Sequence, residues 1–180
     1  MPTRAPLVAN LLLALVSGLV ALVLCEGILR VHYAWSRPTR LDDLATERPM
    51  PPVGSEVGLG DLIQPSPHER LVFELRPGLD VRFTAVQIET NSRGWREVEH
   101  ALDAPPNTVR ILGIGDSVMF GWGVDREQRY TDLFGAKLGE RYPDIQWQTL
   151  TLACPGWNLV MEVEALERYG LAFEPDLILY

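Results

Sequence analysis

The hydrophobic pattern separates a long apolar segment at the N-terminus from a region of short, alternating runs. From Ala5 to Cys25 no residue is charged. About 20 helical residues, each rising 1.5 Å, cross the hydrocarbon core of a bilayer, which is roughly 30 Å thick. A soluble helix of this length would present a polar face, and Asn10 and Ser17 do not form one. The pattern therefore predicts a transmembrane anchor within residues 1–35.

Removal of this segment by a processing protease is the alternative to an uncleaved anchor. A secretory cleavage site needs small residues, and residues 22–27 (LVLCEG) place none where they are required. Residues 22–25 resemble a lipoprotein box, but Leu24 stands where such boxes carry a small residue. We therefore expect an uncleaved anchor. The flanking charges specify its orientation weakly, because basic residues lie on both sides.

The next segment, residues 36–70, is rich in proline and glycine. Such a composition predicts a semi-extended linker or an irregular wrap over the domain that follows. Strand-like runs come next, at residues 71–75 and 80–90, separated by a Pro-Gly pair. Residues 91–94 (NSRG) are typical of a turn.

A β-α-β rhythm begins at Thr108 and predicts a parallel sheet. Residues 109–114 form a short apolar run, typical of a buried parallel strand. A helix is expected between residues 126 and 142, and residues 145–153 alternate as a second strand. The helix is predicted from apolar residues at helical spacing, namely Tyr130, Leu133, Phe134 and Leu138.

A second helix and a third strand are expected after residue 154. Asn158 is a suitable N-cap for a helix that runs to Tyr169, and Gly170 suits the position just after its end. The third strand is expected from residue 175 onward. Residues 71–180 are therefore predicted to form an α/β domain with a parallel sheet.

Charge and residue counts exclude several classes of function. The formal net charge of −8 argues against a nucleic-acid partner, since a basic surface supplies most of that affinity. Cys25 and Cys154 lie in such different surroundings that a disulfide between them is not expected. The histidines have no Cys or His neighbour at metal-ligand spacing, so no metal site is predicted; they are His32, His68 and His100.

The candidate chemistry lies in residues 109–124 (VRILGIGDSVMFGWGV). Ser117 comes directly after the first parallel strand, where open α/β sheets present their sites. A dinucleotide fingerprint would need glycine in place of Val118, and a G-x-S-x-G elbow would need glycine in place of Met119. Taken alone, residues 115–117 (GDS) also suit a plain strand-to-helix turn with a capping serine.

Four segments together resemble the SGNH (GDSL-like) hydrolase family, specifically its membrane-anchored bacterial members. They are similar to that family's N-S-x-G-[FW]-R segment, its first block, its second block and the strand that leads into its third block. In chain order these are residues 91–96 (NSRGWR), 115–123 (GDSVMFGWG), 153–158 (ACPGWN) and 175–178 (PDLI). The resemblance spans roughly residues 70–180. It implies a three-layer α/β/α fold of flavodoxin-like type.

The resemblance also implies roles for individual residues. Ser117 would be the nucleophile, and the backbone N–H groups of Ser117 and Gly156 would form the oxyanion hole. Asp116 and Gly115 would support the turn. The family takes an oxyanion-hole asparagine and an Asp-x-x-His pair from later blocks that this sequence does not contain. We therefore expect the chain to be the N-terminal portion of a longer enzyme, with a degenerate, non-catalytic domain as the alternative.

The function implied is hydrolysis of an ester through an acyl-serine intermediate, without a cofactor. One alternative is transfer of the acyl group to a carbohydrate of the cell envelope, and another is a non-enzymatic envelope scaffold. The expected partners are a membrane and a small-molecule or carbohydrate ester. The resemblance places the domain after the anchor outside the cytoplasm.

Overall fold

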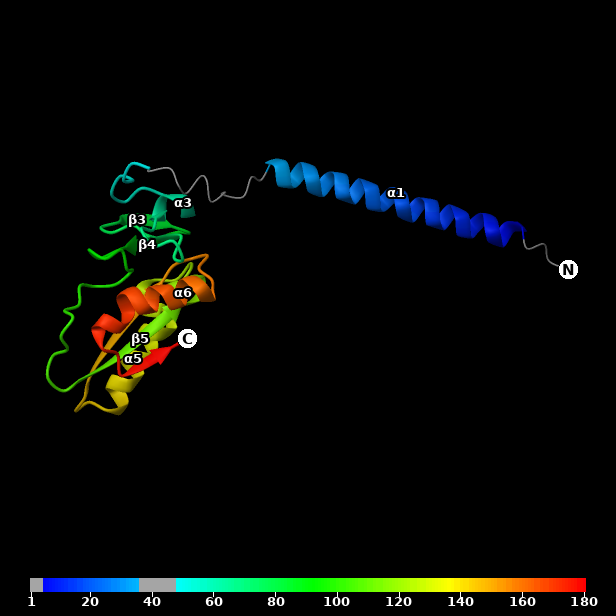
Figure 1. Cartoon of the computed structure of the whole chain (residues 1–180). Coiled ribbons are helices and arrows are strands. Elements are labelled where there is room, and N and C mark those ends of the chain that lie inside the picture. The colour runs from blue at the N-terminus through cyan, green and yellow to red at the C-terminus, as the bar shows by residue number, and fades with distance from the viewer. Residues whose placement is uncertain (1–4, 36–47) are drawn as a thin grey trace. The chain divides into compact units, whose positions relative to one another are not determined.

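The computed structural model describes residues 5–35 and 48–180. The chain divides between residues 40 and 41 into an N-terminal helical unit and a mixed α/β unit (Figure 1).

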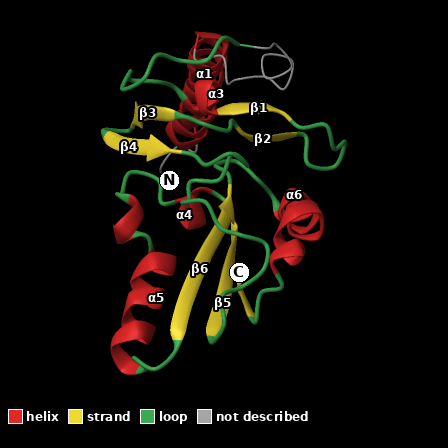
Figure 2. Cartoon of the chain, turned by 90° about the vertical axis from the view of Figure 1, so that its left-hand side faces the viewer, coloured by secondary structure: helices red, strands yellow, loops and turns green. Residues whose placement is uncertain are grey.

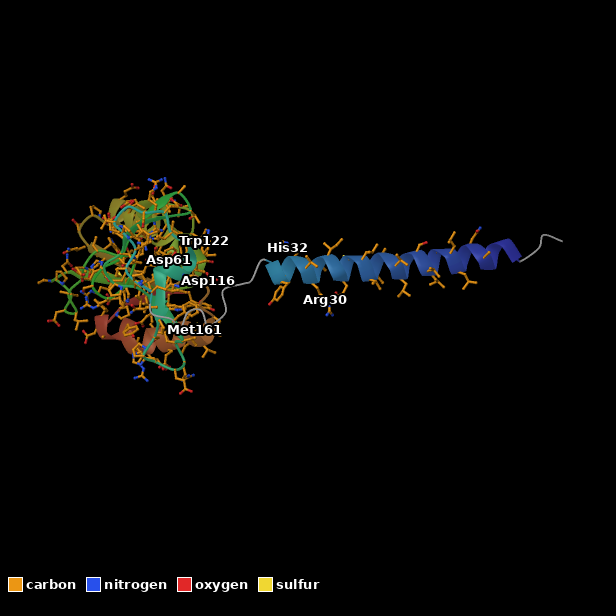
Figure 3. All side chains as sticks on the ribbon, turned by 90° about the horizontal axis from the view of Figure 1, so that it is seen from above. Arg30, His32, Asp61, Asp116, Trp122 and Met161 are labelled. Carbon is orange, nitrogen blue, oxygen red and sulfur yellow. The ribbon has the colours of Figure 1, made fainter. Side chains whose placement is uncertain are left out.

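The first unit is one continuous helix, α1 (Ala5–Trp35). Its stretch Leu12–Ala34 has a mean hydropathy of 2.5, and side chains project both above and below the helix axis in Figure 3. Glu26 and Arg30 lie one turn apart and form an ion pair of 2.7 Å, so these two charges largely neutralise each other. The helix is long and apolar enough to cross a membrane or to serve as a signal sequence.

The centre of the second unit is a three-stranded parallel sheet, as the sequence predicts. Its strands are β5 (Thr108–Gly115), β6 (Gln146–Ala153) and β7 (Leu177–Leu179), in the order β6-β5-β7 (Figure 2). β5 lies in the middle and is buried from Arg110 to its end, which explains its continuous apolar run. Gly115 pairs with Ala153, so β5 and β6 end at the same edge.

Helices pack on both faces of this sheet (Figure 2). On one face, α5 (Tyr130–Arg141) contacts β6, where the Thr131 and Thr151 hydroxyls lie 3.1 Å apart. On the other face, the helical segment after β6 approaches so closely that a Cβ at Gly170 would lie 2.7 Å from Leu112. The second unit is thus a mixed α/β domain.

The α5 helix forms where the pattern predicts, preceded by the 3-10 turn η1 (Arg126–Gln128), but a different face is buried. Tyr130, Leu133 and Phe134 are exposed. Thr131 is buried instead, and a Cβ at Gly135 would lie 2.6 Å from Thr149. Small residues allow this helix to lie close to the sheet, and of the four apolar residues only Leu138 is partly buried.

The helix after β6 begins as predicted and ends differently. Asn158 caps α6 (Leu159–Ala165), and its side chain accepts from the N–H groups of Val160 and Met161. The chain then continues as a π-helical turn, η2 (Leu166–Gly170), and a 3-10 turn, η3 (Leu171–Phe173). Gly170 has a φ of −70° and is not a left-handed cap, so that prediction is wrong. Because glycine has no side chain, Gly170 instead allows close packing on Leu112.

Two short antiparallel pairs precede the parallel sheet. The elements are α3 (Leu59–Leu62), β1 (Ile63–Pro65), β2 (Phe73–Leu75), β3 (Asp80–Phe83) and β4 (Val86–Glu89), with β1 paired to β2 and β3 to β4. The run at 80–90 is therefore a hairpin and not one strand. Its turn, Thr84-Ala85, has positive φ at both residues but lacks the Asn or Gly that usually signals such a turn.

Part of the proline-rich segment belongs to this domain. Leu62 and Leu71 are fully buried and share one apolar core with Leu150 and Phe173. Residues 48–70 therefore wrap over the domain, which was one of the two structures expected. Residues 36–47 of the predicted linker lie outside the described residues.

Candidate active site

Ser117 is the first residue of α4 (Ser117–Phe120), and only Asp116 separates it from the end of β5. Asp116 caps this short helix, because its Oδ1 accepts from the N–H of Val118 at 2.9 Å. Its backbone carbonyl also accepts from the N–H of Phe120, at 2.9 Å. Asp116 thus holds the turn, the role that the sequence favours for it, and the Val118 N–H is already bonded.

Gly115 allows α4 to fold back onto the strand. A Cβ at Gly115 would lie 2.8 Å from the Cβ of Met119, which is buried. Any larger residue at this position would push the start of α4 away from the end of β5. The glycine of the G-D-S segment is therefore needed for the turn.

The Ser117 side chain is half-exposed at the first position of α4. Its hydroxyl forms no hydrogen bond with any residue that the structure describes, whereas its backbone carbonyl accepts from the N–H of Trp122 at 3.0 Å. A hydroxyl in this state is accessible to a ligand.

Gly156 follows the end of the neighbouring strand, β6, at the same edge of the sheet as Ser117. The N–H of Cys154 donates to the carbonyl of Gly115 at 3.3 Å, which extends the parallel pairing by one residue. Gly156 itself is exposed and has a φ of +91°, a conformation that favours glycine. The carboxamide oxygen of Asn158 is occupied by its two capping bonds, so this residue acts as a cap, as expected.

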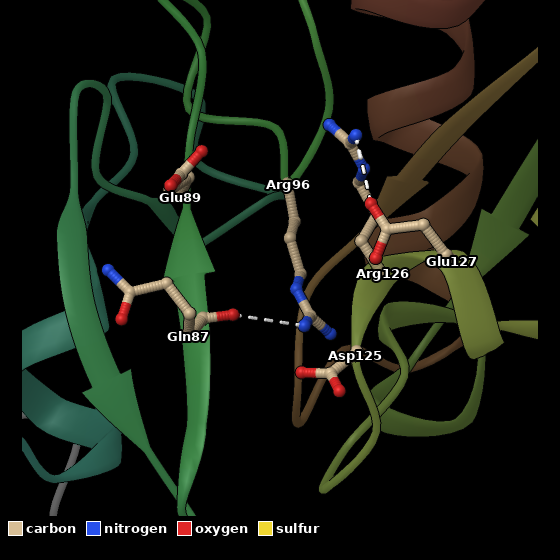
Figure 4. A pocket seen from close by; sticks show the side chains of 6 residues that line it. All are labelled: Gln87, Glu89, Arg96, Asp125, Arg126 and Glu127. Carbon is tan, nitrogen blue, oxygen red and sulfur yellow. Dashed lines mark hydrogen bonds and ion pairs between the residues drawn. The ribbon is translucent and has the colours of Figure 1, made fainter.

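Arg96 connects the upstream N-S-x-G-W-R segment to the loop that follows α4. Its guanidinium donates to the carbonyls of Phe120, Gly121 and Val124, at 3.1, 2.9 and 2.9 Å. It also donates to the carbonyl of Gln87, at 3.2 Å, beside a hollow of about 180 Å³ (Figure 4). Burial, followed by the nearby charge of Arg129, lowers the pKa of Arg96 to about 10.

Arg129 contacts the backbone of Arg96. It donates to the Arg96 carbonyl at 2.9 Å and forms ion pairs with Glu97 at 2.9 Å and Asp132 at 2.7 Å. Burial alone would raise the pKa of Glu97, but the His100 ring, whose Nε2 lies 3.8 Å from the carboxylate, and the ion pair with Arg129 hold it below its usual value. We call Arg96, Arg129, Glu97 and Asp132 the arginine cluster. The sequence indicated none of these roles, since the partners lie up to 33 residues apart.

The histidines of the α/β domain have other partners. His100 Nδ1 lies 2.8 Å from the side-chain nitrogen of Gln148, which is paired with Arg110 in the sheet. Arg110 lies five residues before Gly115, about 16 Å along the strand. His68 contacts the ring of Tyr169. Neither histidine forms a hydrogen bond with Ser117, and among the described residues no three His, Cys, Asp or Glu side chains gather as metal ligands.

A second hollow, of about 250 Å³, opens beside the Ser117 turn and is lined by Asp116, Val118 and Glu162 among others. Ser117 itself is not part of the lining. Glu162 is only 5% exposed, and its Oε2 has no hydrogen-bond partner. No feature of the sequence singles out this residue, because a glutamate in the first turn of a helix is ordinary.

No protein-family model matches the chain, and no curated protein matches it. The resemblance to SGNH hydrolases therefore rests on the four sequence segments themselves.

Proposed function

We propose that Ser117 is the nucleophile of an ester-hydrolysing reaction that passes through an acyl-serine intermediate, in a flavodoxin-like domain of SGNH type. The observation that carries this proposal is the parallel pairing of Gly115 with Ala153. Because both strands end there, the segments that follow them, with Ser117 on one and Gly156 on the other, leave the same sheet edge. The remote N-S-x-G-W-R segment also contacts the Ser117 loop through Arg96.

The proposed chemistry assigns one role to each segment. The Ser117 hydroxyl attacks the ester carbonyl and gives its proton to a base, and the N–H groups of Ser117 and Gly156 donate to the oxyanion that develops on the carbonyl oxygen. The alcohol then leaves with a proton as the acyl-serine forms, and water hydrolyses the acyl-serine to release the acid and restore Ser117. Loss of one such donor typically costs about 3 kcal/mol in the transition state. A serine also needs a proton acceptor within hydrogen-bond reach. His68 and His100 are held by other partners, so the reaction requires a different base.

Labelling with a fluorophosphonate tests this proposal on the membrane fraction. Imidazole added to the buffer supplies a soluble base, so we expect it to accelerate labelling of the peptide that contains Ser117, measured by mass spectrometry. Ser117→Ala should abolish that label, and the matched variant Ser92→Ala, which removes another exposed serine, should retain it. Equal labelling of Ser117→Ala, or none in a folded protein, would contradict the proposal.

We also propose that α1 remains attached as a membrane anchor, with the α/β domain outside the cytoplasm. The support is the length and hydropathy of Leu12–Ala34 and the absence of small residues at a cleavage position in residues 22–27. The membrane fraction used for labelling also tests the anchor, because the chain should stay with the membranes through a carbonate wash. Release of a chain that begins beyond Cys25 would be the contrary result.

A further inference from the structure

The hollow beside the Ser117 turn combines acidic groups with an apolar floor. Two carboxylates line it, from Asp116 and Glu162, together with the phenols of Tyr130 and Tyr180. Ile114 and Met119 supply apolar surface, and both are buried. No Lys or Arg side chain is part of its lining among the described residues.

Glu162 has unused hydrogen-bonding capacity. Its side chain is 5% exposed, yet Oε2 has no partner. Buried carboxylate oxygens are normally paired, because leaving one unpaired costs the full desolvation penalty of the group. A carboxylate oxygen only accepts hydrogen bonds, so the missing partner is an N–H or O–H donor.

The neighbouring groups favour a cationic donor over a neutral one. Burial, and to a smaller extent the charge of Asp116, raises the pKa of Glu162, while a hydrogen bond from the Tyr180 hydroxyl acts in the opposite direction. The two carboxylates therefore repel each other. A neutral hydroxyl would leave that repulsion in place, whereas a positive charge would relieve it. A metal ion would need more ligands than two carboxylates, one of which already accepts from Val118. The Tyr130 hydroxyl is directed at the sulfur of Met119, 2.8 Å away.

We propose that this hollow binds a primary ammonium group, whose N–H donates to the Glu162 carboxylate while its alkyl portion packs on Ile114 and Met119. Asp116 supplies a second negative charge nearby. Since Asp116 and Val118 line the hollow on either side of Ser117 in the chain, a bound ammonium lies next to the proposed nucleophile. The role of selecting a cationic ester rests on the proposed function, but the binding itself needs no reactive serine.

Titration of the full chain in lipid nanodiscs with propylammonium tests the site. At constant ionic strength, we expect saturable shifts of the amide signals of Gly115, Val118 and Glu162 in a two-dimensional ¹H–¹⁵N spectrum. The isosteric neutral probe, 1-propanol, should give none at the same concentrations. Glu162→Gln should weaken binding at least tenfold, and the matched control Glu167→Gln, an exposed residue of the next helical segment, should leave it unchanged.

Three outcomes would overturn this proposal. They are equal shifts with 1-propanol, unchanged affinity in a folded Glu162→Gln variant, and equal binding of tetramethylammonium, which carries the charge but has no N–H donor. Ser117→Ala should bind propylammonium as the unmodified chain does. Loss of fluorophosphonate labelling with intact ammonium binding would therefore contradict the proposed function alone, and the reverse pattern would contradict this site alone.

Discussion

Two groups of buried charges lie near the turn that carries Ser117, and they differ in how well they are paired. In the arginine cluster, the Arg129 side chain is fully buried with two ion pairs, and Arg96 donates to four backbone carbonyls. In the hollow beside the turn, Glu162 is almost as buried and has an oxygen with no partner. Breaking a buried ion pair is costly because it leaves one charge without its partner, and a buried oxygen that has no partner carries such a cost already.

The largest expected effect is on the arginine cluster. Arg129→Met would leave the carboxylate of Glu97 buried beside an apolar side chain. Removing one partner of a buried ion pair typically costs about 3–5 kcal/mol, so we expect a loss of this size in the free energy of unfolding. Urea unfolding of the chain followed by near-UV circular dichroism measures it.

The control for this variant is Arg126→Met, in which the residue removed pairs with the exposed Glu127 on the surface. A surface pair contributes roughly 0–1 kcal/mol, so the control should unfold almost as the unmodified chain does. Equal effects of the two substitutions would mean that the arginine cluster does not stabilise the Ser117 loop.

A smaller effect is expected from the glycines after α4. Gly121 and Gly123 both have positive φ, of +79° and +75°. A Cβ at Gly121 would overlap the side chain of Arg129, whereas nothing lies within 4 Å of a Cβ at Gly123. Gly123→Ala should therefore cost only the backbone strain, about 1 kcal/mol, and Gly121→Ala should cost roughly 1–3 kcal/mol more.

Urea unfolding also measures the stability of these two alanine variants. Fluorophosphonate labelling of Ser117 provides a second measurement. Because the Gly121 carbonyl accepts from Arg96, displacement of this loop should also slow fluorophosphonate labelling. Equal stability of the two alanine variants would show that contact with Arg129 does not constrain the loop.

The smallest expected effect is a gain in stability when Glu162 is substituted. Its pKa in the folded protein is raised by burial, with Asp116 adding to this and a hydrogen bond from Tyr180 opposing it, so ionisation disfavours the folded state at pH values above that pKa. At low pH the carboxyl is neutral and this penalty disappears. Glu162→Gln should therefore raise the melting temperature by roughly 3 °C at pH 8 and by less at pH 4.

Differential scanning calorimetry at the two pH values checks the sign. A lower melting temperature at pH 8 would mean that the Glu162 carboxylate is stabilised by a partner, which would remove the contrast with the arginine cluster. A gain in stability together with weaker propylammonium binding would instead fit a residue retained for a ligand at the expense of stability.

The elements predicted well are those whose cause lies within a few neighbouring residues. The uncharged run from Ala5 to Cys25 is sufficient to predict α1, and the apolar run at 109–114 is sufficient to predict β5. Asn158 caps α6 and Asp116 caps α4 through bonds that span two or three residues. Ser117 could be singled out for the same reason, since it follows a buried strand directly.

What the sequence alone could not predict depends on contacts between distant segments. Gly170 suits a helix cap by local rules, but close packing on Leu112 decides its conformation. Arg96 reaches carbonyls 24 to 28 residues further along the chain, and Glu162 lies beside Asp116 only because α6 packs near the end of β5. The sequence by itself determined the apolar helix, the parallel strands and the serine turn, because periodicity and capping act locally. Only the tertiary structure decided which buried charges are paired, because pairing depends on the surroundings of each side chain.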